Sequence, residues 1–347
     1  MRTVLLALGL LLAPVMTAGA VSSDEGTPPL NRQLGGHTFQ LPIFQQSALI
    51  TTHVGIREGV ARYSVPAMPT GGIERRDLWL LGLQSTLDLG LRLTDWLDLS
   101  VFARATSVIG ANVVSLVTDG GSLDSVGQAG VGVRLLRSEA SGTQLTLRAV
   151  GGLTKERQLT LLPFIRAITN NPLLTVDDVL NGQAREYLLV PASEKSVTGG
   201  VFLAQSLGPA FSLQASAIAD YAWRTSKPFD AVAGGRVEQK TEATRVNLAA
   251  ALTADMGPPL GIPIAVMGEY LFTTGWRTEV ELPDHTLHSH SLALGVYYSG
   301  RPHLQVGLGA AATLDAEPRR TLNAEGETLE SDDTTLTYAQ LILRYIF

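Results

Sequence analysis

The sequence of 347 residues contains no cysteine. Disulfides, thiolate metal sites and thiol catalysis are therefore excluded, and so is a lipid anchor on an N-terminal cysteine. Exported proteins that fold in water often rely on disulfides. This chain must reach its stability in another way.

Charged residues are also scarce, at 17% of the chain, and they leave a net charge of −6. Nucleic acid requires a strongly basic surface, so we expect no nucleic-acid partner. After the first residues, no window offers the roughly 18 unbroken apolar positions that a membrane-spanning helix needs. No linker rich in proline or serine divides the chain, which favours one continuous architecture.

The first twenty residues are typical of a secretory signal peptide. Arg2 supplies the positive start, residues 4–12 the apolar stretch, and residues 18–20 the small-residue cleavage site. A transmembrane helix is the alternative, but the apolar run is short and Pro14 follows it. We predict cleavage near Ala20 and export of a mature chain that begins near Val21.

Long alternation of apolar and polar residues is the dominant pattern. Over residues 82–93 every second position is apolar or small, and leucine fills most of these positions. The alternation lasts much longer than the usual strand of about 5 to 6 residues. It recurs in five hairpins with turns near residues 95, 140, 208, 258 and 300. A first strand over 48–63 and a last over 336–347 bring the predicted number to twelve.

The connections alternate as well. The five turns are tight, whereas the connections near 64–74, 110–125, 155–194, 223–241, 274–286 and 315–334 are longer. Outer-membrane barrels alternate short periplasmic turns with long external loops. We predict an all-β fold, a closed antiparallel up-and-down transmembrane β-barrel of about twelve strands with both termini in the periplasm. A soluble sandwich is the alternative, but its outward faces would be charged.

The end of the chain carries a second signal. Leu341, Leu343, Tyr345 and Phe347 share one face of the last predicted strand. This resembles the C-terminal insertion signal of bacterial outer-membrane proteins, which the barrel-assembly machinery reads. Aromatic side chains at a strand end also suit the interfacial girdle of a barrel. The mature chain thus resembles the outer-membrane β-barrel superfamily, including its porin-like and transporter-like members. That resemblance implies contact with outer-membrane lipid in a Gram-negative cell envelope.

If the leucine and valine faces meet lipid, the opposite faces line the lumen. The predicted pore-lining residues are Gln84, Asp88, Arg92, Arg104, Arg134, Arg148, Gln214, Asp220, Arg245, Asn247, Glu269, Gln305, Gln340 and Arg344. Arginine outnumbers the acids in this set, which favours anionic or polar solutes if the pore is open. Alternatively, arginine and carboxylate pair across the interior and fill it.

Two segments and one strand leave alternatives open. Residues 155–194 carry an apolar run and a predicted short helix over 176–187, and they either fold inward or dock a partner. Residues 21–46 form a periplasmic segment that either enters the lumen or stays free, and residues 47–347 form the barrel. The first strand is the weakest, because glycine and charged residues over 55–59 interrupt its apolar face.

Catalytic and metal-binding patterns are weak. His288 and His290 share a strand face near His285, but a metal site needs a third converging ligand. Neither a phosphate-cradling loop nor a nucleophile elbow occurs in a suitable context. We therefore predict no metal, no cofactor and no enzymatic activity.

Together these patterns predict an outer-membrane channel or transporter that passes small polar solutes passively. The alternative is a structural or interaction barrel in a secretion, adhesion or surface-assembly complex with envelope protein partners. A lipid-modifying hydrolase is a lesser alternative.

Overall fold

The structure is a computed structural model that describes residues 32–65, 78–111, 120–159, 188–230, 235–279, 282–316, 320–322, 328–331 and 333–347. Within those ranges, no helix combines the length and hydropathy that crossing a membrane requires. The predicted signal peptide and the predicted helix over 176–187 lie outside the described residues.

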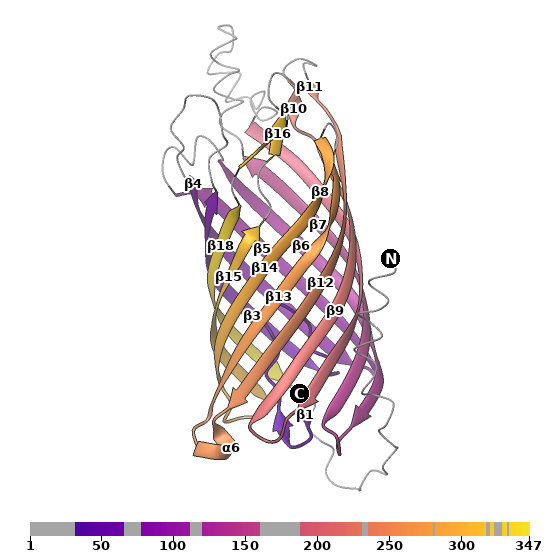
Figure 1. Ribbon diagram of the computed structural model, residues 1–347, viewed down its shortest axis with the longest axis vertical. Helices are drawn as coiled ribbons and strands as arrows, with labels where there is room; N and C mark the ends of the chain where they lie inside the picture. The colour runs from indigo at the N-terminus through magenta and orange to yellow at the C-terminus, as the bar shows by residue number, and fades with distance from the viewer. Residues whose placement is uncertain are drawn as a thin grey trace.

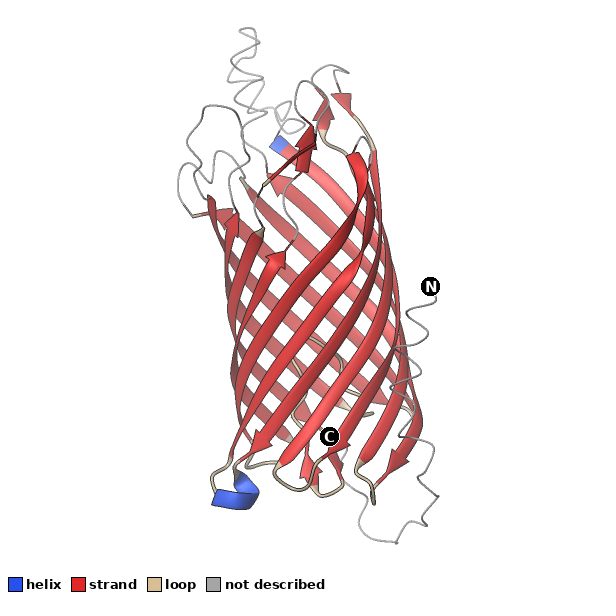
Figure 2. Cartoon of the chain, in the orientation of Figure 1, coloured by secondary structure: helices blue, strands red, loops and turns tan. Residues whose placement is uncertain are grey.

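Twelve long strands form a closed antiparallel barrel, which confirms the predicted fold (Figures 1 and 2). The wall strands are β3 (His53–Val65), β4 (Leu78–Arg92), β5 (Leu97–Gly110), β6 (Gly121–Ser138), β7 (Thr143–Leu159), β8 (Leu189–Ser206), β9 (Phe211–Ser226), β12 (Gln239–Asp255), β13 (Ile264–Glu279), β14 (Leu282–Tyr298), β15 (Leu304–Ala316) and β18 (Thr334–Ile346). Each wall strand pairs with the next one along the chain, and β18 pairs with β3 to close the wall. Closure leaves no free edge in the wall, so every wall strand is hydrogen-bonded on both sides.

The two rims of the barrel differ. At one rim, here called the turn end, the connections are 93–96, 139–142, 207–210, 256–263 and 299–303, as predicted. The short helix α6 (Gly257–Leu260) lies in the fourth of them. The opposite rim, the loop end, carries the two-stranded sheets β10 (Phe229–Asp230) with β11 (Gly235–Arg236) and β16 (Arg320–Leu322) with β17 (Thr328–Glu330).

One predicted loop is wrong. The connection expected over 274–286 is reduced to residues 280–281, because β13 and β14 extend almost to their hairpin turn. Thr274, Arg277 and His285 are polar, and the sequence pattern treats them as loop residues. Ladder hydrogen bonds use backbone groups only, so pairing continues past the apolar part of a strand.

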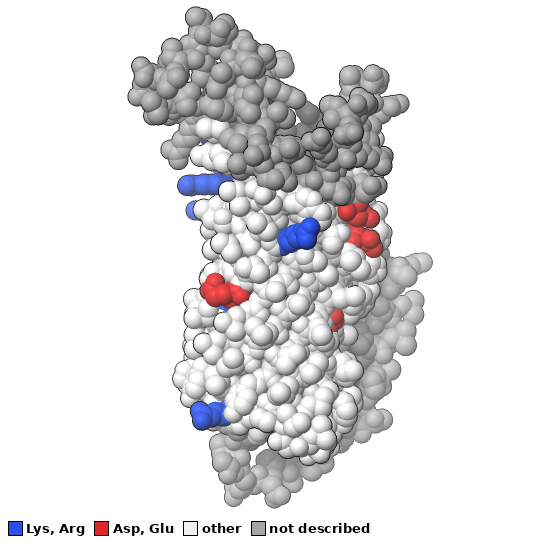
Figure 3. All heavy atoms as spheres, turned by 90° about the vertical axis from the view of Figure 1, so that its left-hand side faces the viewer, with Lys and Arg blue, Asp and Glu red and all other residues white. Residues whose placement is uncertain are grey.

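The outer face of the barrel is apolar. The face in Figure 3 shows only scattered charged residues over its described part. On β18, Leu341, Leu343, Tyr345 and Phe347 are 51%, 47%, 46% and 59% exposed, while the intervening Arg344 is 3% exposed. Apolar side chains outward and polar side chains inward reverse the pattern of a soluble barrel and match a wall that contacts lipid.

The weakest predicted strand is a regular part of the wall. β3 pairs with β4 and with β18 without a register shift. Of residues 55–59, Gly55 and Arg57 lie on the inner face, and the charged one on the outer face is Glu58, which accepts a hydrogen bond of 2.6 Å from the Ser85 hydroxyl. The predicted start at Ala48 is wrong, because residues 48–52 leave the wall and lie within the lumen.

Candidate functional site

Residues 32–52, here called the plug, lie inside the barrel at its turn end. The segment opens with a hairpin in which β1 (Gln33–Leu34) pairs with β2 (His37–Thr38). Gly35 and Gly36 form its turn at φ of 56° and 77°, a conformation that side chains other than glycine rarely adopt. The remaining loop is visible within the lower half of the barrel in Figure 2. Its buried apolar side chains are Leu34, Phe39, Leu41, Ile43, Ala48, Leu49 and Ile50.

Arg32 anchors the start of the plug to the barrel rim. Its guanidinium donates to the carbonyl oxygens of Pro302 and Arg301, at 2.6 and 2.8 Å, and to that of Leu304 at 3.1 Å. Burial lowers the pKa of Arg32 to about 10, and the nearby Asp255 opposes that change. Arg32 is therefore still cationic at neutral pH, and it ties the plug to the connection over 299–303.

One row of wall side chains alternates a polar residue with alanine at the level of the plug. Each residue of the row pairs with the next one on the adjacent strand, in the order Gln144, Ala204, Gln214, Ala251, Glu269 and Ala293. The alanines leave room for the long polar side chains to reach inward. The Gln144 amide donates to the Ala48 carbonyl at 2.6 Å, and the Gln214 amide donates to the Gln40 carbonyl at 2.7 Å.

Glu269 is the acid of this row and is 4% exposed. Its carboxylate accepts hydrogen bonds from the backbone N–H groups of Ile43 and Phe44, at 2.7 and 3.0 Å. These bonds use plug backbone rather than plug side chains, so they fix the path of the segment.

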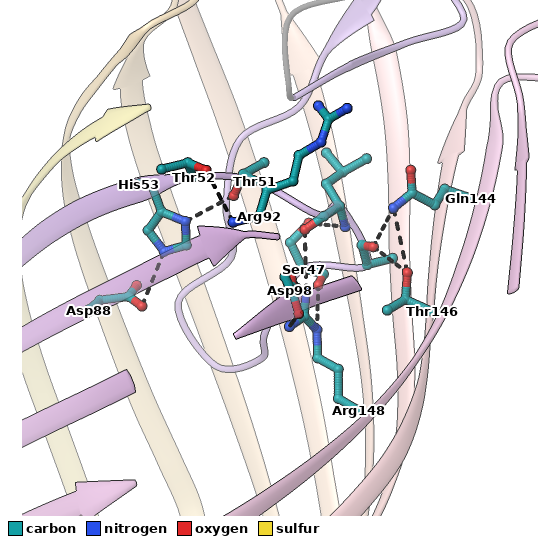
Figure 4. A network of polar contacts seen from close by, with 12 residues as sticks. Ser47, Thr51, Thr52, His53, Asp88, Arg92, Asp98, Gln144, Thr146 and Arg148 are labelled. Atoms are coloured by element: carbon teal, nitrogen blue, oxygen red, sulfur yellow. Dashed lines mark hydrogen bonds and ion pairs between the residues drawn. The ribbon is translucent and has the colours of Figure 1, made fainter. Parts of the chain in front are cut away.

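Two ion pairs, one buried and one half-buried, complete the attachment, and each one spans a glycine. Gly132 is the register partner of both Asp98 and Arg148, and a carbon added at Gly132 would meet both charged side chains. Figure 4 shows the contact between Asp98 and Arg148. Arg148 contacts the Asp98 carboxylate through two nitrogens, at 2.8 and 2.9 Å. The same guanidinium donates to the carbonyl oxygens of Ser47 and Leu49, at 3.2 and 3.3 Å.

The second pair repeats this geometry. Gly55 is the register partner of both Asp88 and Arg344, whose side chains meet at 3.0 Å. Arg344 also donates to the Leu41 carbonyl at 3.1 Å, and His53 lies 3.3 Å from the other Asp88 oxygen. In both pairs the glycine lies on the strand between the two charged residues. Because it has no side chain, the acid and the arginine can meet across that strand.

We therefore expect Gly132→Ala to lower the free energy of unfolding by about 1–3 kcal/mol, because the new methyl group would overlap both Asp98 and Arg148. Gly151→Ala is the matched control, since no atom lies within 4 Å of the position of its added carbon. Urea unfolding of the two variants measures the difference. An equal effect of both substitutions would contradict the role given to Gly132.

A chamber of about 550 Å³ lies between the plug and the wall. Its lining includes Ile43 and Phe44 from the plug and Arg57, Arg104 and Tyr338 from the wall. A smaller cavity of about 230 Å³ lies among wall residues alone and is lined by Glu194, Ala222, Arg224, Thr241, Ala243, Arg245, Arg277 and Glu279. The lumen thus holds solvent-sized space beside a segment that fills its turn end.

Comparison with known proteins supports the fold. The translocator domain of the autotransporter NalP from Neisseria meningitidis superposes with a TM-score of 0.50 at 8% identity, covering 86% of this chain and 88% of that one. The fold is that of a bacterial outer-membrane β-barrel. No protein-family model and no curated protein matches the sequence.

Two further structures give lower scores. An outer-membrane channel from Pseudomonas putida has a TM-score of 0.49 at 13% identity, covering 93% of this chain and 100% of that one. The β domain of the Bordetella autotransporter BrkA has a TM-score of 0.47 at 12% identity, covering 86% and 100%.

In this barrel the predicted pore-lining residues divide into groups. Those that line the chamber are Gln84, Asp88, Arg104, Arg148, Gln340 and Arg344. Those that bond to plug atoms are Arg148, Gln214, Glu269, Gln305 and Arg344. Asp220 pairs with Arg245 at 2.8 Å, and Asn247 accepts a hydrogen bond from Thr273. Arg92 and Arg134 lie near the turn end of their strands, and neither lines the chamber.

Several residues of this site are absent from the predicted set. Asp98 and Gln144 are two of them, although both lie on the polar faces of predicted hairpins, where alternation could have identified them. Arg57 was treated as an interruption of the first strand, and no sequence signal marks Arg32. His288 and His290 lie on β14 and bond to Thr274 and Tyr270. Among the described residues, no group of three His, Cys, Asp or Glu could hold a metal ion.

The plug should loosen in mild acid. Burial lowers the pKa of His37 from its usual 6.5, and Arg32 adds to this, whereas the Pro209 carbonyl at 2.9 Å and Asp255 oppose it. In a released plug the His37 imidazole is protonated near pH 6.5, whereas in a seated plug it is protonated only at lower pH. Each pH unit below 6.5 therefore weakens seating by at most about tenfold.

Hydrogen exchange of the plug backbone, followed between pH 7.5 and 5 and corrected for the intrinsic exchange rate, measures this effect. Protection should fall with the pH, and His37→Gln should remove most of the dependence. A dependence that is unchanged in the His37→Gln variant would assign it to another group.

Proposed function

We propose that this protein is an outer-membrane channel for the passive passage of small polar solutes and that the plug closes it at rest. The observation that carries the proposal is the way in which the plug is held. Wall side chains bond to its backbone across a polar lumen. Water can replace the plug backbone at these polar groups, so departure of the segment would expose a passage lined by charged and amide side chains.

We propose further that the turn end faces the periplasm. The plug, the start of β3 and the end of β18 all lie at this rim, and short turns are typical of the periplasmic side. In this arrangement residues 1–20 are removed on export, residues 341–347 guide insertion, and lipid contacts the outer face. Passive passage requires no catalytic group and no cofactor.

Solute entry into liposomes tests the proposed function. In an open variant, residues 32–52 are replaced by a glycine–serine segment of equal length. Small neutral sugars should enter liposomes that carry the open variant faster than protein-free liposomes, and entry should fall with increasing sugar size. Entry at the protein-free rate for every sugar would overturn the channel proposal.

A secretion barrel is the second candidate, and the similarity to an autotransporter translocator domain favours it. Translocation needs a chain that crosses the whole height of the lumen. The plug instead begins and ends at the turn end, with Arg32 at the connection over 299–303 and Thr52 beside Phe347. Surface exposure of an epitope tag placed after Ala20 would favour the secretion barrel over the channel.

A further inference from the structure

The chamber contains two arginines that have no carboxylate partner. Four arginines line it, and two of them, Arg148 and Arg344, are ion-paired with Asp98 and Asp88. Among the described residues, the other two form no ion pair. We propose that these two arginines, Arg57 and Arg104, bind a small organic carboxylate with an apolar, ring-sized body. This inference rests on the proposed channel function, because it names the class of solute.

Strand register directs both guanidinium groups into the same space. Arg57 is the partner of Thr86, and Thr86 is the partner of Arg104, so the three residues form one row across β3, β4 and β5. Adjacent strands lie about 4.8 Å apart, which separates the two arginine backbones by roughly 10 Å. Long side chains that start at that distance on one face can converge on a single anion. Guanidinium groups match carboxylate geometry and bind it through paired hydrogen bonds.

Arg57 has a donor available for such a ligand. One terminal nitrogen donates to the Ile43 carbonyl at 3.1 Å, and the guanidinium carbon lies 5.6 Å from the centre of the Phe102 ring. Its Nε is buried and has no hydrogen-bond partner. A buried donor without a partner costs free energy, and a rotation of the guanidinium that brings Nε to a ligand oxygen would remove that cost. Arg104 is exposed and lines the chamber, and it forms no hydrogen bond and no ion pair with a described residue.

The rest of the chamber suits an apolar body. Phe44 of the plug meets Tyr338 of the wall edge to face, with ring centres 6.5 Å apart, and Phe102 lies below Arg57. The volume of about 550 Å³ falls within the usual range of small-molecule sites, about 300–1,000 Å³. The third acid of the chamber, Asp124, faces Thr106, which lies two positions along β5 toward the loop end from Arg104. A ligand whose carboxylate contacts Arg57 and Arg104 and whose ring lies beside Phe44 would therefore keep its negative charge away from Asp124.

Titration calorimetry of the intact protein in detergent tests the site. Benzoate is the probe, and benzamide is its neutral counterpart of the same shape. Benzoate should bind, and benzamide should bind at least about tenfold more weakly. Arg104→Gln should weaken benzoate binding by roughly tenfold, since one charge-assisted contact is lost. Arg134→Gln is the matched control, because it removes the same charge from the lumen wall outside the chamber, and it should leave benzoate binding unchanged.

Arg57→Gln combined with Arg104→Gln should abolish benzoate binding while the barrel keeps its folded mobility on a gel. The inference is overturned if benzoate does not bind, if benzamide binds equally well, or if Arg104→Gln has no more effect than Arg134→Gln. Entry of neutral sugars through the open variant decides the channel proposal separately. Sugar entry without benzoate binding would leave the channel in place and remove only the carboxylate site.

Discussion

Replacing Arg148 with methionine should lower the free energy of unfolding by about 3–5 kcal/mol. The substitution removes the cation and leaves Asp98 charged and buried, with a side chain that is 4% exposed. Arg148 also donates to the Ser47 and Leu49 carbonyls, so the plug loses two attachments in the same step. Urea unfolding followed by tryptophan fluorescence measures the loss.

Two variants make this result specific. Arg224→Met removes an arginine that is also ion-paired, to Glu156, but whose side chain is 42% exposed, so we expect a loss of at most about 1 kcal/mol. Asp98→Asn added to Arg148→Met should recover part of the lost stability, because it removes the unpaired charge. If Arg148→Met cost no more than Arg224→Met, the ion pair would not be the attachment described here.

The barrel itself was predictable because its signal is periodic. Alternation over each hairpin fixes which residues face outward, and the alternating connection lengths fix the order of strands. The pattern assigned Arg344 and Gln340 to the lumen and Leu341 and Phe347 to the outer face, as the structure has them. The two-residue period identifies which side chains face the lumen, but it does not say what those side chains contact.

The attachment of the plug was not predictable from one sequence. It depends on which residues are neighbours across three strands, and a shift of register would separate Asp98, Gly132 and Arg148. The plug has no periodic pattern of its own, because its contacts run through backbone groups that every residue carries. The full length of β13 and β14 was not predicted for a related reason. Many of their residues near the hairpin turn are polar, but the backbone groups of these residues are still paired, so the strands continue.

Replacing residues 32–52 with a flexible segment should raise single-channel conductance by at least about tenfold. Barrels of eight strands are filled by their own side chains, and those of sixteen hold an aqueous pore. A barrel of twelve strands lies between these cases, so its turn end is closed only if an added segment fills it. The plug supplies that segment with seven buried apolar side chains and the bonds to the wall.

Single-channel recording in planar bilayers shows whether the plug closes the lumen, with the intact protein and the open variant compared in the same salt. We expect rare, brief openings for the intact protein and a steady, larger conductance for the open variant. Gly151→Ala, which alters the barrel wall and not the plug, should behave like the intact protein. Equal steady conductance from the intact protein and the open variant would show that residues 32–52 do not close the lumen.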